Sequence, residues 1–419
     1  MNAISLFSGC GGLDFGIEAA GFNVSVYNDN DSFCCSTLRL NNKLNIIEAP
    51  IENVSISDIT PFTGSSRNSI DLVVGGPPCQ PFSKSGYWRN GDTLRLSDPR
   101  ASTLTHYFRI ISELLPRCFL LENVHGLNYS GKEEGFHLIL ESIKNINRVH
   151  CTNYIPVWRV INMADYGVPQ QRIRFFLIAM RDDKEFVFPE PTHTRAPEFP
   201  DFPFDNKTNL QSYVTSWEAI GKLQPDSEEH LSVGGQWGDL LPSIPEGENY
   251  LWHTDRKGGL PLFGWRTRFW SFLLKLAKQM PSWTIQAQPG SAVGPFHWDN
   301  RKLSWRELAA LQTFPREFLV TGPRAEIQRQ IGNAVPSLFG EIIGRAIASQ
   351  LSGQVFAKAL SLEIPRVKYF PNPESLGDVP SKYLKYVGIH KPHPGTGKGN
   401  SYQFAREAKS LNSISGIDR

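Results

Sequence analysis

Short apolar runs alternate with helical patterns over residues 1–180, and this alternation constrains the fold more than any other feature of the chain. Amphipathic patterns such as Gly12–Ala20 and Thr103–Leu115 lie between the apolar runs. Strands that alternate with helices are typical of a doubly wound, mostly parallel sheet, so we predict an α/β fold. The predicted strands are Ala3–Phe7, Asn23–Asn28, Ile70–Val74, Cys118–Leu121, Tyr154–Ile161 and Arg174–Ala179.

The composition indicates a soluble globular protein, with 40% apolar and 20% charged residues in a chain of 419. No apolar run reaches the ~18 residues of a membrane span, and the first residues lack the pattern of a signal peptide. The six cysteines include no C-x-x-C pair, which argues against a zinc site and against a disulfide framework. We therefore expect a cytoplasmic protein without a membrane partner or a metal.

A change in amino-acid composition divides the chain. The segment Phe186–Phe204 is rich in Pro, Phe and Thr, which is typical of a domain boundary. Residues 195–300 are rich in Gly, Pro and Trp and have weak periodicity, so they predict a smaller, loop-rich domain. Amphipathic helices follow at Leu303–Leu311 and Leu338–Leu351. Beyond Ser352 the Pro-, Gly- and Lys-rich composition predicts a loosely packed extension.

The first predicted strand leads through a glycine turn into a helix. Glycines there let main-chain N–H groups approach a ligand closely at the start of a helix. The dinucleotide fingerprint requires a third glycine at position 14, where this chain has Asp14, so a nicotinamide oxidoreductase is disfavoured. Asp29 ends the second strand, where a carboxylate commonly binds ribose hydroxyls, although an Asp in a turn also serves local hydrogen bonding. Together the features predict an adenosine-containing ligand without a pyrophosphate.

A second turn follows the strand Ile70–Val74 and carries Cys79 in the sequence Gly-Gly-Pro-Pro-Cys-Gln-Pro-Phe. Open α/β sheets bind their ligands at the carboxyl ends of strands, and prolines on both sides of Cys79 restrict the backbone. An isolated cysteine in a proline turn is more often a buried apolar residue than a nucleophile. The accompanying motifs decide between the two.

In order along the chain, the motifs are Phe7-Ser8-Gly9-Cys10-Gly11-Gly12, Pro78-Cys79-Gln80, Glu122-Asn123-Val124, Gln170-Gln171-Arg172-Ile173-Arg174, Arg306-Glu307, Leu311-Gln312-Thr313-Phe314-Pro315 and Gln330-Ile331-Gly332-Asn333-Ala334-Val335-Pro336. Together they resemble the motifs of the DNA cytosine-C5 methyltransferases, and the resemblance runs from Ile4 to about Gln350. The family implies a Rossmann-like methyltransferase fold that uses S-adenosyl-L-methionine. It also implies a target recognition domain inserted into the catalytic domain. We predict a catalytic domain at 1–194, the recognition domain at 195–322, a returning catalytic segment at 323–352 and an extension at 353–419.

The resemblance implies covalent catalysis, because cytosine C5 is a poor nucleophile until a thiolate adds to C6. Cys79 matches the nucleophile. Glu122 matches the residue that contacts N3 and the exocyclic amine, and it must carry a proton to donate to N3, so we expect a raised pKa. A salt bridge at the strand end is the alternative role of Glu122. Arg174 would bind cytosine O2, and Arg172 would orient the cysteine loop or a phosphate, unless both simply lie at a sheet edge.

The family further implies a cofactor site and a DNA-binding surface. The expected cofactor residues are Phe7, Ser8, Gly9, Gly11, Gly12, Leu13, Asp29, Asn30, Ile51, Pro78, Asn333 and Ala334. The family often has an acidic residue before the aliphatic one at Ile51, but here that position is Pro50, which has no side-chain acceptor. The expected DNA-binding residues are Ser85, Arg256, Lys257, Arg266, Arg268 and Thr284.

These motifs predict a DNA (cytosine-5-)-methyltransferase that flips its target base from double-stranded DNA. The resemblance implies the modification enzyme of a restriction–modification system, a monomer that associates with the nucleoid through DNA. A cognate endonuclease would act on the same site without a stable complex. A relative that methylates tRNA is disfavoured by the long insert between residues 175 and 305. A non-catalytic DNA-binding relative is disfavoured because Cys79 and Glu122 are both present.

Overall fold

The computed structural model describes residues 1–63, 69–78, 102–124, 134–195, 210–265, 269–354, 359–388 and 390. The chain divides into two compact units. Unit 1 comprises Met1–Glu229, Lys278–Gln288 and Ser304–Phe370, and unit 2 comprises His230–Ala277, Pro289–Leu303 and Pro371–Arg419. The predicted recognition domain, residues 195–322, is therefore divided between the units, and its function stays a prediction.

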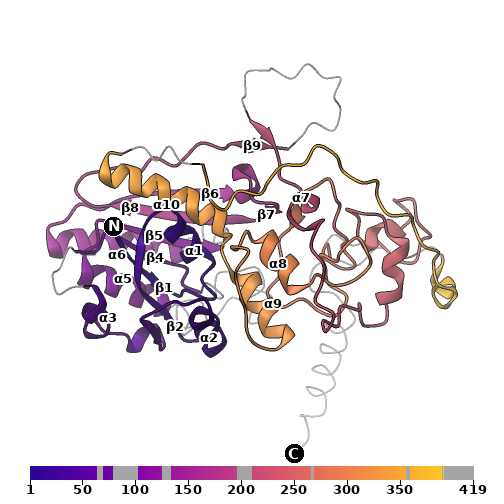
Figure 1. The fold of residues 1–419 in the computed structure, drawn as a ribbon, viewed down its shortest axis with the longest axis horizontal. Helices are drawn as coiled ribbons and strands as arrows, with labels where there is room; N and C mark the ends of the chain where they lie inside the picture. Colours follow the sequence, from indigo (N-terminus) through magenta and orange to yellow (C-terminus); the bar gives the residue numbers. More distant parts are fainter. Residues whose placement is uncertain are drawn as a thin grey trace, which may run out of the picture. The chain divides into compact units, whose positions relative to one another are not determined.

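A seven-stranded sheet forms the centre of unit 1, in the order β3-β2-β1-β4-β5-β8-β6 (Figure 1). Strand β8 is antiparallel to its neighbours β5 and β6, whereas the other neighbouring pairs are parallel. The mostly parallel α/β fold is thereby confirmed. The strands are β1 (Asn2–Leu6), β2 (Asn23–Asp29), β3 (Ile46–Glu48), β4 (Leu72–Gly75), β5 (Cys118–Val124), β6 (Ile155–Asn162) and β8 (Ile173–Met180).

Helices cover both faces of this sheet (Figure 1). Helices α1 (Gly12–Ala19) and α10 (Ser337–Ser352) pack in one apolar cluster with alternate sheet residues such as Val74 and Leu120. Helices α3 (Ile56–Thr63), α5 (Ser102–Leu114) and α6 (Glu134–His150) pack in the other, with the neighbouring residues Val73 and Phe119. Successive side chains of a strand point to opposite faces, so one apolar run supplies both cores.

Helices α1 and α10 approach each other very closely. A Cβ atom at Gly16 would lie 2.2 Å from the main-chain oxygen of Ser337, so this crossing requires glycine. The contact joins the first helix of the chain to α10, the last α-helix among the described residues. The segment that returns after the loop-rich region thus packs against the first helix of unit 1.

The remaining elements in the described part of unit 1 are short. They are α2 (Ser32–Leu40), η1 (Ile51–Asn53), η5 (Met163–Tyr166), β7 (Gln170–Gln171), β9 (His193–Thr194), β10 (Gln211–Ser212), α7 (Ser216–Ile220), β11 (Ser282–Trp283), α8 (Trp305–Leu311) and α9 (Arg324–Asn333). Helices α7 and α8 each begin with a capping box, from Thr215 to Glu218 and from Ser304 to Glu307. Each box satisfies N–H groups at the start of its helix.

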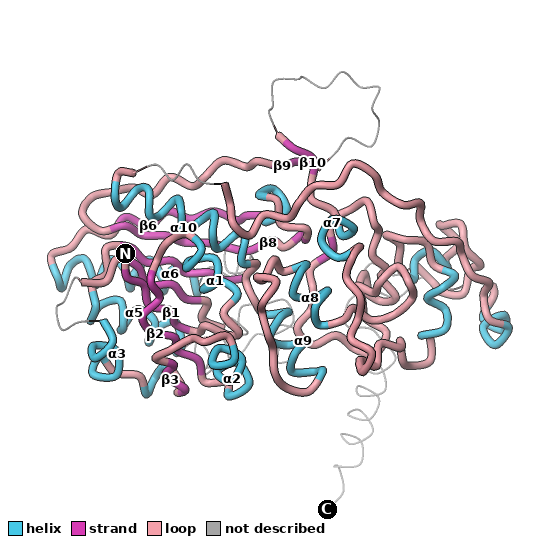
Figure 2. Tube along the Cα trace, in the orientation of Figure 1, coloured by secondary structure: helices cyan, strands magenta, loops and turns pink. Residues whose placement is uncertain are grey.

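The described part of unit 2 consists mostly of loops (Figure 2). Its 3₁₀ segments are η6 (Gly238–Ser243), η7 (Tyr250–His253) and η8 (Ser381–Tyr386). Its apolar cluster includes Leu240, Tyr250, Phe296 and Tyr383, and Tyr383 stacks on Trp237. Tyr383, within the predicted extension, thus contributes to this core. Among the described helices of the whole chain, none combines the length and the hydropathy of a membrane-crossing segment.

Candidate active site

The turn between β1 and α1 lies beside the end of β2. Gly9 and Gly11 adopt positive φ angles of 56° and 88°, a region that favours glycine. The Gly9 N–H donates a hydrogen bond of 2.8 Å to Asp29 Oδ2, and the Ser8 N–H donates to the Asn28 carbonyl at 2.9 Å. The predicted turn residues and the predicted carboxylate therefore meet at one end of the sheet.

Main-chain donors hold both carboxylate oxygens of Asp29. Besides the bond from Gly9, Oδ1 accepts from the Asp31 N–H at 2.9 Å. Burial raises the pKa of Asp29. Each oxygen keeps a further lone pair, so the carboxylate can still accept from hydroxyls of a ribose. Asn30 is exposed next to it, as a ligand-facing residue at a strand end would be.

The returning segment meets the same turn. A Cβ atom at Gly12 would lie 2.5 Å from the Val335 carbonyl oxygen and 2.8 Å from Ala334 Cβ. The predicted cofactor residues of the first motif and of the last therefore lie together. Asn333 is exposed beside them, whereas Leu13 is buried in the core between the sheet and α10.

The segment that contains Ile51 follows β3. Ile51 is 3% exposed and packs in the apolar cluster beneath the sheet, so its side chain faces the core in this structure. The Asn28 amide donates to the carbonyls of Ile47 and Ala49, both at 2.9 Å. Glycine N–H groups, a carboxylate and this fixed segment fit an adenosine-containing cofactor such as S-adenosyl-L-methionine.

Glu122 lies beside the segment that leads into Cys79. A Cβ atom at Gly76 would lie 3.1 Å from Glu122 Oε2, and the Asn123 amide donates to the Pro77 carbonyl at 3.1 Å. Pro78, an expected cofactor residue, is exposed and its carbonyl accepts from Thr103 Oγ1 at 3.5 Å. Cys79 and Ser85 lie outside the described residues.

Two arginines act electrostatically on Glu122. Arg174 Nε lies 3.3 Å from Glu122 Oε1. Burial raises the pKa of Glu122, and the positive charges of Arg174 and Arg172 oppose that rise. The direction agrees with the expected proton on this carboxyl group.

Arg172 is 1% exposed, and burial lowers its pKa well below the usual value. Its Nη2 donates to the Asn333 carbonyl at 3.1 Å, while Nε and Nη1 have no hydrogen-bond partner within the described residues. A buried guanidinium with unused donors is costly unless a ligand or another segment completes it. Arg172 thus links the arginine motif to the last motif, a contact that the sequence did not indicate.

The expected DNA-binding residues lie in both units. Thr284, in unit 1, follows β11, which pairs with β7, and its Oγ1 donates to the Gln171 carbonyl at 2.7 Å. Arg256 and Lys257, in unit 2, are exposed. The Arg256 guanidinium lies 4.7 Å from the centre of the Trp265 ring, and Lys257 Nζ lies 2.8 Å from Glu248 Oε1. Arg266 and Arg268 lie outside the described residues.

Buried amide side chains support the site, and sequence reasoning did not assign them a role. Gln170 donates to Gln312 Oε1 at 3.0 Å and accepts from the Ile285 N–H at 3.1 Å. Gln312 in turn donates to the carbonyls of Ile331 and Ala334. This network connects the arginine motif, the Thr284 segment and the last motif. The glutamines that recur in these motifs, at Gln170 and Gln312, were the available signal.

Comparisons with known proteins show which proteins the chain is similar to. The family model described as C-5 cytosine-specific DNA methylase matches residues 1–349. The chain is similar to the Type II methyltransferase M.SacI of Streptomyces achromogenes, with 39% identity over 83% of this chain and 93% of that protein. It is also similar to the Type II methyltransferase M.NgoFVII of Neisseria gonorrhoeae, with 33% identity over 80% of this chain and 82% of that protein.

Solved structures agree at the level of the fold. A putative DNA modification methyltransferase encoded within a prophage (E. coli) covers 84% of this chain and 99% of its own, with a TM-score of 0.56 and 23% identity. The methyltransferase EhMeth of Entamoeba histolytica covers 84% of this chain and 98% of its own, with a TM-score of 0.53 and 17% identity. At these identities the likeness shows the fold alone.

Proposed function

This chain belongs to the C-5 cytosine-specific DNA methylase family, and from that membership we propose that it methylates one cytosine within a specific duplex sequence as the modification enzyme of a restriction–modification system. It is a DNA (cytosine-5-)-methyltransferase, as the motifs predicted. The family implies S-adenosyl-L-methionine as the methyl donor.

One observation carries the residue roles in this proposal. The Glu122 carboxyl group lies between the Arg174 guanidinium and Gly76, three positions before Cys79 in the chain. Burial raises the pKa of this carboxyl group, and in its protonated form the group can donate to cytosine N3 while a thiolate adds to C6. Arg174 then binds O2, and Arg172 holds the main chain of Asn333.

S-adenosyl-L-methionine supplies the electrophilic methyl group when it is bound. Asp29 accepts hydrogen bonds from its ribose, and the Phe7–Gly12 turn lies against its methionine part. No metal takes part in the proposed chemistry. Thr284 supports the backbone of the flipped nucleotide, and the exposed Arg256 and Lys257 contact the DNA.

In this function the enzyme acts as a monomer on double-stranded DNA in the cytoplasm and associates with the nucleoid. A cognate endonuclease cuts the same sequence without forming a stable complex with it. Residues 195–322 contain the region that selects the sequence. An exchange of residues 195–300 with those of another family member should change the sequence that is methylated.

Bisulfite sequencing of DNA from cells that express the chain tests the proposal, because it reports the modified base and its context together. We expect one methylated cytosine within one sequence, and none with Cys79→Ser, which should still bind DNA. An oligonucleotide with 5-fluorocytosine at the target should form a covalent adduct with the wild type only. Methylated tRNA with unmodified DNA, or robust turnover by Cys79→Ser, would contradict the proposal.

A further inference from the structure

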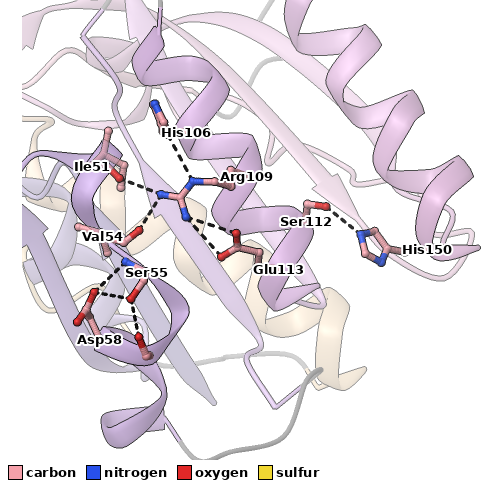
Figure 3. Close-up of polar contacts among 10 residues, drawn as sticks. Ile51, Val54, Ser55, Asp58, His106, Arg109, Ser112, Glu113 and His150 are labelled. Carbon is pink, nitrogen blue, oxygen red and sulfur yellow. Dashed lines mark hydrogen bonds and ion pairs between the residues drawn. The ribbon is translucent and has the colours of Figure 1, made fainter.

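Arg109, on α5, reaches the segment that carries Ile51. Its Nη2 donates to the carbonyl of Ile51 at 3.0 Å and to the carbonyl of Val54 at 2.7 Å, so one nitrogen spans both ends of η1 (Figure 3). Ile51 and Val54 are both buried. The Ile51 carbonyl also accepts from the Val54 N–H at 3.3 Å, and Arg109 adds a donor both to it and to the Val54 carbonyl.

The guanidinium of Arg109 is itself held in place. Nη1 lies 3.4 Å from Glu113 Oε1, one turn later on α5, and Nε donates to His106 Nδ1 at 3.4 Å. All three nitrogens of the group are therefore engaged (Figure 3). The planar fork of arginine can make these bonds at once, whereas the single ammonium group of lysine cannot.

Helix α5 is a firm support for this contact. The Tyr107 hydroxyl donates to the Leu120 carbonyl on β5 at 2.9 Å, and a Cβ atom at Gly75 on β4 would lie 2.6 Å from the Tyr107 ring. Tyr107 thus fixes α5 to two central strands. Arg109, on the same helix, binds the segment after β3.

The same segment is held from its other side. Asn28, on β2, donates to the carbonyls of Ile47 and Ala49, directly before the turn that Arg109 holds. Asn28 immediately precedes Asp29, the proposed ribose ligand. Side chains from two elements therefore fix the main chain from Ile47 to Val54 relative to Asp29.

We propose that Arg109 is a positioning residue that sets the affinity of the enzyme for the adenosine part of S-adenosyl-L-methionine by fixing the Ile51 turn. The inference rests on the proposed function, in which Asp29 binds the ribose, and on the expectation that the segment of Ile51 lies beside the adenosine part of the cofactor. Pro50 offers no side-chain acceptor there, so the position of the main chain matters more in this chain. Arg109 acts through the turn and does not belong to the reacting groups.

The test compares Arg109→Met, Arg109→Lys and Ser112→Ala in the full-length enzyme. Ser112 is the matched control because it lies on the same helix, and its hydroxyl bonds to His150 Nε2 at 2.8 Å, away from the turn (Figure 3). Titration calorimetry with S-adenosylhomocysteine gives the dissociation constant without DNA. Steady-state kinetics then give KM for the cofactor and kcat, and thermal melts report folding.

For Arg109→Met we expect the dissociation constant and KM to rise about tenfold or more, with kcat at saturating cofactor within about twofold of wild type. The dissociation constant and KM of Arg109→Lys should lie between those of wild type and Arg109→Met. Ser112→Ala should keep the wild-type dissociation constant even if its melting temperature falls. A dissociation constant within about twofold of wild type in folded Arg109→Met, or in Arg109→Lys should the first variant not fold, overturns the inference. A wild type that binds S-adenosylhomocysteine but methylates no DNA instead overturns the proposed function.

Discussion

Arg174 and Glu122 form an ion pair, with Nε and Oε1 3.3 Å apart, across two antiparallel strands of the central sheet. Arg174 lies opposite Val124, two residues beyond Glu122, so the side chain reaches back along the strand pair. The arginine charge lowers the pKa of Glu122, whereas burial raises it, and burial is the larger effect. The arginine therefore sets how high the pKa of this carboxyl group rises.

The pH dependence of methyl transfer should report this pair. Protonated Glu122 is the proposed donor, so the single-turnover rate should fall as pH rises through its raised pKa. Arg174→Met removes a charge that lowers that pKa, so the fall should move to higher pH. Arg174→Lys keeps the charge and is the matched control, because both variants lose the planar fork that binds O2.

Rapid-quench measurements across the pH range compare the two variants. Glu122→Gln should be about a hundredfold slower or more and should lack the fall with pH, because an amide does not titrate. The same pH midpoint in Arg174→Met and Arg174→Lys would contradict an electrostatic role for Arg174.

Asp14 should make folding stability depend on pH. Its side chain is 1% exposed, Oδ1 accepts from Ser5 Oγ at 2.6 Å, and Oδ2 has no partner within the described part of the chain. Burial raises its pKa from 3.8 to about 7. Between these values the folded state keeps a proton that the unfolded chain releases, so the free energy of unfolding falls as pH rises from about 4 to 7 and is level above.

Urea unfolding of wild type and Asp14→Asn measures this effect. The asparagine variant does not ionise, so its free energy of unfolding relative to wild type should be higher at pH 8 than at pH 4 by on the order of 3 kcal/mol. Asp58→Asn is the control, since hydrogen bonds from Ser55 hold the pKa of this exposed carboxyl below its usual range. The change in the free energy of unfolding caused by Asp58→Asn should be the same at pH 5 and at pH 8. A constant Asp14→Asn difference over that range would mean that Asp14 is charged throughout.

The sequence predicted the layers of the fold better than the directions of its strands. All six predicted strands are present in the sheet, but the apolar pattern of β8 does not reveal that it runs antiparallel between β5 and β6. A strand that is buried on both faces lacks the alternation of apolar and polar residues, which would otherwise distinguish an edge strand of the sheet from a central one. Strand β3 was missed because three residues are too few to show a period.

For the site, the sequence located groups at strand ends, such as Asp29 and Glu122, because parallel strands place their ends together. It did not indicate the role of Arg109 or Asn28. The partners of these side chains are main-chain carbonyls, which every residue has, so sequence letters do not display them. A lone arginine on a helix also resembles an ordinary solvated residue.

Residues beyond the family match should stabilise unit 1 through Glu341. This α10 residue is fully buried, and its carboxylate accepts from the N–H groups of Ser361 and Leu362 and from Arg345 Nη2 at 2.6 Å. Glu341→Ala removes the buried acceptor of the Ser361 and Leu362 N–H groups and should lower the free energy of unfolding by about 3 kcal/mol. Denaturant unfolding measures the loss, and limited proteolysis should cleave after the end of α10 sooner than in wild type.

Glu48→Ala is the control for this prediction, because the Arg39–Glu48 ion pair is exposed. Exposed pairs contribute about 0–1 kcal/mol, so its stability should stay close to wild type. Equal losses in the two variants would mean that the segment after α10 does not depend on the buried carboxylate.

Arg256 and Lys257 should contribute differently to DNA recognition. Trp265 supports the Arg256 guanidinium as a flat fork, which suits bidentate contact with guanine, whereas Lys257 is an exposed point charge beside Glu248. Arg256→Met should cost about 1–3 kcal/mol for the cognate sequence and relax specificity at one position. Lys257→Met should weaken binding to all sequences alike and reduce the salt slope by about 1.

Lys382→Met is the control, since Lys382 pairs with Asp239 elsewhere in unit 2. Titrations of cognate and unrelated duplexes at several salt concentrations measure both effects, and an equal, uniform loss for Arg256→Met and Lys257→Met would assign Arg256 to phosphate contact alone.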